Sequence, residues 1–172
     1  HTSRLIRAMI TEIFPEDIVR VVEGGAEQSR QLLELPFDHI FFTGSTAVGK
    51  LVMQAAAKNL SSVTLELGGK SPTLIDHSAD LRDAAKRIAF GKFLNNGQTC
   101  IAPDYVLLDS RIQDSFINLL RAEIKKLFGD GRDIDETSSS YSRLATERQF
   151  SRMATLIADA VERGATAERL GP

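Results

Sequence analysis

Apolar residues along the chain alternate between the spacing typical of an amphipathic helix and the short runs typical of a strand. Spacings of three and four predict helices, and compact apolar runs between glycine, proline or polar residues predict strands. The predicted helices cover residues 5–13, 26–35, 45–56, 81–93, 110–127 and 150–161. The predicted strands cover residues 18–22, 39–42, 63–67, 73–75 and 105–108, with 39–42 expected to be buried. This alternation predicts an α/β fold with mostly parallel strands.

Two segments interrupt the alternation. Residues 129–140 are polar and acidic, so we expect a loop there. Gly68 and Gly69 follow the strand that ends at Leu67, and consecutive glycines allow the chain to turn sharply. A functional seam is therefore predicted at these two glycines.

Composition excludes several classes of protein. The 172 residues carry 21 Lys and Arg against 23 Asp and Glu, a net charge of −2. This balance excludes a strongly basic nucleic-acid binder and gives no reason to expect an anionic membrane as partner. One cysteine and three scattered histidines exclude a disulfide framework and a cysteine-based zinc site, so no metal is expected. No run approaches the roughly 20 apolar residues of a membrane span, and we expect a cytoplasmic, reduced protein.

The first candidate site is the turn from Gly44 to Gly49, between a predicted strand and a predicted helix. Glycines let a ligand approach the backbone, and a helix N-terminus offers unpaired N–H groups that suit a pyrophosphate. Ser45 and Thr46 add hydroxyl donors. The spacing G-x-x-x-x-G matches neither the usual dinucleotide fingerprint nor a P-loop. The alternative is an ordinary strand-to-helix turn with a Ser/Thr cap.

The second candidate is Glu66, at the end of an apolar strand. A carboxylate there is expected to be partly buried or to face a cleft, and burial would raise its pKa toward the range of a general base. The alternative is a solvated glutamate paired with Lys70.

The third candidate is Cys100, which follows Asn95-Asn96-Gly97-Gln98-Thr99 after a predicted helix. Small and polar neighbours are expected to keep its thiol accessible, as a nucleophile requires. The alternative is a buried, inert cysteine, since free cysteines are usually core residues. No histidine lies nearby in sequence, although the fold could bring His39 or His77 close.

Together these segments resemble the aldehyde dehydrogenase superfamily. The resemblance is carried by Phe42-Thr43-Gly44-Ser45-Thr46-x-Val48-Gly49, by Leu65-Glu66-Leu67-Gly68-Gly69-Lys70-Ser71-Pro72 and by Gly97-Gln98-Thr99-Cys100, in that order. The 34 positions from Glu66 to Cys100 also match the family's spacing. Ala102-Pro103-Asp104-Tyr105 resembles the branch that holds coniferyl and fatty aldehyde dehydrogenases.

The resemblance implies a role for each candidate residue. The turn Gly44, Ser45, Thr46, Ala47, Val48 and Gly49 would hold NAD or NADP, with Ser45 on the pyrophosphate and Val48 near the adenine. The Leu67 backbone would contact the nicotinamide amide. Cys100 would be the nucleophile and Glu66 the general base. Residues 1–67 would be the C-terminal part of a Rossmann-like cofactor domain, and residues 68–172 the N-terminal part of the α/β catalytic domain.

The implied reaction oxidises an aldehyde, aromatic (such as coniferyl aldehyde) or long-chain, to the acid through a cysteine thioester. The resemblance also implies a homo-oligomeric parent enzyme of which this chain is an internal fragment, weak or inactive alone. Three alternatives stay open. One is a relative that passes the acyl group to coenzyme A or phosphate, another is a non-catalytic remnant module, and the third is a simple thioesterase.

Overall fold

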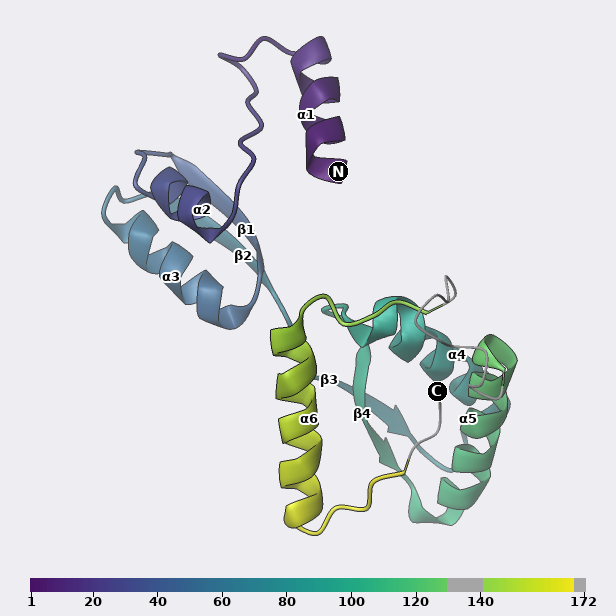
Figure 1. Ribbon diagram of the computed structural model, residues 1–172. Helices are drawn as coiled ribbons and strands as arrows, with labels where there is room; N and C mark the ends of the chain where they lie inside the picture. Colours follow the sequence, from purple (N-terminus) through teal and green to yellow (C-terminus); the bar gives the residue numbers. More distant parts are fainter. Residues whose placement is uncertain (130–140, 169–172) are drawn as a thin grey trace. The chain divides into compact units, whose positions relative to one another are not determined.

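The computed structural model describes residues 1–129 and 141–168. The chain forms two compact units, His1–Leu67 and Gly68–Pro172, and each is described here by itself (Figure 1). The predicted loop at 129–140 lies outside the described residues, apart from Gly129.

The first unit contains a pair of parallel strands with a helix packed on it. The order of elements is α1 (Thr2–Ile13), α2 (Ala26–Leu33), β1 (His39–Gly44), α3 (Thr46–Ala57) and β2 (Ser62–Leu67). β1 pairs with β2 in a register that runs from His39 opposite Ser62 to Gly44 opposite Leu67. α3 packs against both strands and buries Gly49, Val52 and Ala56. The helix–strand alternation and the parallel pairing predicted here are confirmed.

Two predictions for this unit are wrong. Residues 18–22 form no strand. Among the described residues, the sheet of the first unit contains only β1 and β2, so residues 18–22 have no neighbouring strand with which to form backbone hydrogen bonds. β1 is also not fully buried. Ile40 and Phe42 are half-buried on one face, whereas Phe41, on the other face, is 66% exposed.

The second unit also contains a parallel strand pair. Its elements are β3 (Ser71–Ile75), α4 (Leu81–Phe93), the 3₁₀ helix η1 (Leu94–Gly97), β4 (Pro103–Leu108), the 3₁₀ helix η2 (Ser110–Ile112), α5 (Gln113–Phe128) and α6 (Glu147–Glu162). β3 pairs with β4, so Ser71 lies opposite Pro103 and Ile75 opposite Leu108. α4 packs against α5 and β4. The predicted helices and strands of this half are confirmed.

The core of the second unit gathers near the carboxyl ends of its strands. Ile75, Ala85, Ile88 and Phe116 form the buried cluster, and Ile112, at the start of α5, packs against it. α4 begins at Asp80, whose carboxylate accepts hydrogen bonds from the N–H groups of Arg82 and Asp83. The apolar stripe predicted for this helix supplies Ala85 and Ile88, two of the four residues of the buried cluster.

Candidate active site

The turn that follows β1 begins α3 with a side-chain cap. Ser45 is the N-cap, and its Oγ accepts a hydrogen bond of 3.3 Å from the Val48 N–H. The first turn of α3 contains no acidic residue. Unpaired N–H groups and the positive end of the helix dipole are therefore left without a carboxylate to compete for them. The cap expected as the simpler alternative is present, and the same geometry suits an anion.

Gly49 brings the start of this helix close to the end of β2. A Cβ at Gly49 would lie 2.8 Å from Leu67 Cδ2, closer than real carbon contacts allow. A Cβ at Gly44 would lie 2.5 Å from the Phe42 ring. Neither position has room for a side chain, because strand, turn and helix lie close together there. Gly44 lies opposite Leu67 in the register, so the carboxyl ends of both strands meet at this turn.

Glu66 is exposed, so the expected partial burial is wrong within the residues described. The reason is strand alternation: Leu65 and Leu67 face Gly49 on α3, and Glu66 between them faces the opposite side. The alternative ion pair with Lys70 is also wrong. Lys70 Nζ instead pairs with Asp104, 3.3 Å from Oδ1 and 3.2 Å from Oδ2.

Cys100 lies between η1 and β4 and is exposed, as predicted for an accessible thiol. The alternative of a buried, inert cysteine is therefore wrong. The backbone at Gly69 lies close to that of Cys100, because a Cβ at Gly69 would lie 2.8 Å from the Cys100 carbonyl oxygen. Of the two glycines predicted as a seam, Gly69 thus lies against the backbone of the candidate nucleophile, whereas Gly68 does not.

The turn before Cys100 has an unusual backbone that the sequence analysis missed. Asn95, Asn96 and Gly97 are consecutive and have φ values of 50°, 53° and 70°. Three hydrogen bonds join Asn95 and Gln98. The Asn95 side chain donates to the Gln98 carbonyl at 3.2 Å, and both the side chain and the backbone N–H of Gln98 donate to the Asn95 carbonyl at 3.1 Å. The Asn-Asn-Gly composition was the available signal, since these residues tolerate left-handed backbone best.

Within the second unit, His77 is remote from Cys100, and the His39 ring is engaged inside the first unit. In the first unit, both ring nitrogens of His39 contact hydroxyls of β2, Ser62 at 2.7 Å and Thr64 at 3.1 Å. His77 follows β3, whereas Cys100 lies near the beginning of that strand. Five strand residues span about 17 Å, so His77 belongs to the opposite end of the strand pair.

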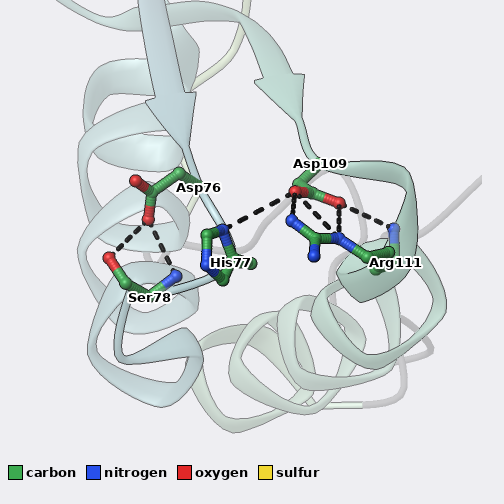
Figure 2. Close-up of polar contacts among 5 residues, drawn as sticks. All are labelled: Asp76, His77, Ser78, Asp109 and Arg111. Carbon is green, nitrogen blue, oxygen red and sulfur yellow. Dashed lines mark hydrogen bonds and ion pairs between the residues drawn. The ribbon is translucent and has the colours of Figure 1, made fainter.

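A second group of titratable residues surrounds His77 (Figure 2). The hydrogen bond from the Ser78 hydroxyl, followed by that from its N–H, lowers the pKa of Asp76. The hydrogen bonds from the Arg111 side chain and N–H lower the pKa of Asp109. His77 Nδ1 lies 3.9 Å from Asp109 Oδ2. These contacts are local turns and caps, so the lowered pKa values are explained without a ligand.

Residues 1–129 and 141–168 contain neither a metal-binding cluster nor a helix suited to a membrane. No cluster of three His, Cys, Asp or Glu side chains in these ranges could hold a metal ion. No helix there has both the length and the apolar character that crossing a membrane requires.

Comparison with known proteins identifies relatives of the whole described chain. The aldehyde dehydrogenase family model matches residues 1–171. A Pseudomonas aeruginosa protein named "Probable coniferyl aldehyde dehydrogenase" is 48% identical over 165 residues, which is 96% of this chain and 34% of that protein. A mouse protein named "Aldehyde dehydrogenase, dimeric NADP-preferring" is 46% identical over 157 residues, covering 91% and 34%.

A solved structure shares the fold. The substrate-bound state of Staphylococcus aureus AldH superposes with a TM-score of 0.82 and 42% identity, covering 93% of this chain and 34% of that one. The chain therefore spans about a third of the length of each of these three proteins.

Proposed function

Because the chain belongs to the aldehyde dehydrogenase family, we propose that the protein carrying it oxidises an aldehyde to the carboxylic acid with NAD or NADP. The observation that carries this proposal is the exposed Cys100 thiol, with Gly69 set against its backbone three residues after Glu66. The proposal assigns this thiol as the nucleophile and the Glu66 carboxylate as the base.

Cys100 performs the covalent part of the reaction. Its thiolate adds to the aldehyde carbon, the carbonyl π electrons move to oxygen, and a thiohemiacetal oxyanion forms on sulfur. When the oxyanion collapses, the hydride leaves the same carbon and a thioester remains on Cys100. The bound dinucleotide supplies the acceptor for this hydride. Sulfur suits both steps, because it is a strong nucleophile and later a good leaving group.

Glu66 is the general base of the second half-reaction. It takes a proton from a water molecule whose oxygen attacks the thioester carbonyl, and expulsion of the Cys100 thiolate releases the acid. Three residues of extended chain reach at most about 11 Å. The chain itself therefore holds Glu66 within that distance of Gly69. The exposed position of its carboxylate leaves it accessible to water.

The turn after β1 fits the cofactor. Residues 44–49 would hold the dinucleotide, with the Ser45 hydroxyl and the first N–H groups of α3 available to its pyrophosphate. The absent side chain at Gly49 and the lack of acidic residues in the first helical turn support this assignment. We assign Val48, which is 44% exposed, to the adenine of the cofactor, and the Leu67 backbone to the nicotinamide amide. Residues 1–67 then belong to the cofactor domain and 68–172 to the catalytic domain.

The proposed substrate is an aromatic aldehyde such as coniferyl aldehyde, or a long-chain aldehyde. The similarity to the Pseudomonas aeruginosa relative and the Ala102-Pro103-Asp104-Tyr105 segment support this class. We also place the complete enzyme in the cytoplasm as a homo-oligomer. Glu66 favours hydrolysis over transfer to coenzyme A, because only attack by water needs a base at this point.

The test uses the complete enzyme that contains this chain. Cys100→Ser should lower aldehyde-dependent NAD(P)H formation by about 10³-fold or more, as loss of a nucleophile does elsewhere. Glu66→Gln should trap the acyl group, visible by mass spectrometry as a thioester on the Cys100 peptide. Glu12→Gln, an exposed carboxylate on α1, is the matched control. Full activity of Cys100→Ser would overturn the nucleophile, and acyl-coenzyme A as the product would overturn hydrolysis.

A further inference from the structure

The segment that presents Cys100 is held in a backbone conformation that needs external support. Three consecutive residues, Asn95 to Gly97, are left-handed, and two of them carry side chains. Left-handed residues normally occur singly, and a run of them persists only where the surroundings over-determine it. The contacts that hold this turn therefore decide where Cys100 lies.

The Gln98 side chain ties the turn to a segment far along the chain. Its Nε2 donates to the Asn95 carbonyl at 3.1 Å and to the Arg143 carbonyl at 2.9 Å. Its Oε1 accepts from the Ala145 N–H at 3.0 Å. The amide nitrogen thus joins the turn to the Arg143 carbonyl, and the amide oxygen binds the Ala145 N–H. Gln98 itself lies only two positions before Cys100.

Tyr141 provides a second tie from the same segment. Its hydroxyl donates a 2.5 Å hydrogen bond to Asn96 Oδ1, at the middle of the left-handed run. Its ring packs edge-on against Phe128, with centroids 5.3 Å apart, and Phe128 packs against Phe93 at the same separation. The phenol is therefore anchored on the ends of α4 and α5, and burial raises its pKa.

We propose that Tyr141 and Gln98 are positioning residues that clamp the 95–97 turn through residues 141–145 and so orient the Cys100 thiol. The effect on turnover rests on the proposed function, whereas the effect on thiol geometry does not. Neither residue touches the reacting atoms. Each acts through the backbone of the turn that leads to Cys100.

The test measures the thiol directly in the complete enzyme. The rate at which iodoacetamide alkylates Cys100 is measured at several pH values by mass spectrometry of the Cys100 peptide. The values of kcat, KM and Tm are measured for the same variants. Tyr141→Phe keeps the ring and removes only the hydroxyl. The matched control is Tyr105→Phe, because Tyr105 lies on β4 with 46% exposure and is the chain's other tyrosine.

Tyr141→Phe should lower kcat by about 10-fold, the loss expected for one hydrogen bond to a polar partner, with KM within about twofold. The alkylation rate of Cys100 should change in the same variant and remain unchanged in Tyr105→Phe. Gln98→Glu, which replaces the amide donor by a carboxylate facing two carbonyls, should have a larger effect. Asn96→Gly keeps the left-handed backbone while removing the acceptor, so its effect should not add to that of Tyr141→Phe.

A fall in Tm with unchanged alkylation and kcat in all three variants would overturn the clamp and leave a purely structural contact. If Gln98→Glu does not fold, Tyr141→Phe and Asn96→Gly decide the matter. If Cys100→Ser retains full activity, the proposed function fails. Alkylation then still reports whether the clamp orients the thiol.

Discussion

The two ends of the β3–β4 pair are stabilised in different ways. At the carboxyl end, Ile75 and Phe116 lie in the buried core, and Asp76, Asp80 and Asp109 each make bonds to residues within three positions. At the other end, Cys100 is exposed, and its turn is held by bonds that span 45 and 47 positions of sequence. One end depends on packing and local caps, the other on distant hydrogen bonds.

Under the proposed function, this difference makes carboxylates with shifted pKa values poor guides to the site of the second unit. Ligands of parallel sheets usually bind at the carboxyl ends of the strands, and β1 and β2 fit this rule through the turn at Ser45. In the second unit that end carries Asp76 and Asp109, whose lowered pKa values arise from their own turns. The candidate chemistry lies instead where β3 and β4 begin.

The largest expected effect is on the packed end. Phe116→Ala should cost about 3–5 kcal/mol of unfolding free energy, because a side chain only 3% exposed leaves a cavity against Ile75 and Ile88. Thermal or urea unfolding of the complete enzyme measures this, with the 61% exposed Phe90→Ala as control. Equal losses of unfolding free energy in both variants would show that Phe116 is not part of the core.

At the other end, Gly69→Ala should lower kcat by about 10–100-fold, since displacement of a reacting group by about 1 Å is that costly. Its Cβ would lie 2.8 Å from the Cys100 carbonyl oxygen, a backbone atom that cannot rotate away. Gly68→Ala is the matched control, because nothing lies within 4 Å of a Cβ at that glycine. Similar rates for the two variants would refute the close approach.

A moderate effect is expected at the cap of α4. Asp80→Ala should destabilise the fold by about 1 kcal/mol, because the Arg82 and Asp83 N–H groups lose their acceptor. Asp80→Asn retains an acceptor and should restore most of the loss in Tm. The rate of Cys100 alkylation should stay at the wild-type value in both, and a change there would mean that the two ends are coupled.

The smallest effect concerns acid stability. The pKa of Asp109 is lowered in the folded state by Arg111. Its contribution is therefore present above the ordinary aspartate pKa and is lost as the pH falls through the lowered value. Asp109→Asn should lower Tm slightly at neutral pH, and its difference from wild type should shrink in acid. Asp17→Asn is the control, and a difference that grows in acid would contradict the stated direction.

Among the described residues, the sequence predicted each of the α-helices α1 to α6 and the parallel pairing, since these follow from local periodicity, but it did not predict the 3₁₀ helix η1. It also located the Ser45 turn and the accessible Cys100. The strand predicted at residues 18–22 is absent because an apolar run forms a strand only where a neighbouring strand can pair with it. The burial of Glu66 could not be predicted because it depends on which face of β2 is covered by α3. Tyr141 and Gln98 escaped notice because their partners are dictated by tertiary folding and by no local pattern.

The span of the clamp has a consequence for the order in which the molecule matures. The turn that presents Cys100 cannot be completed until residues 141–145 have folded back onto it, and contacts between residues so distant in sequence form late. A nascent chain that has emerged only as far as α5 already exposes the sulfur but lacks the ties that orient it. The Cys100 thiol therefore takes its final orientation only after residues 141–145 have docked.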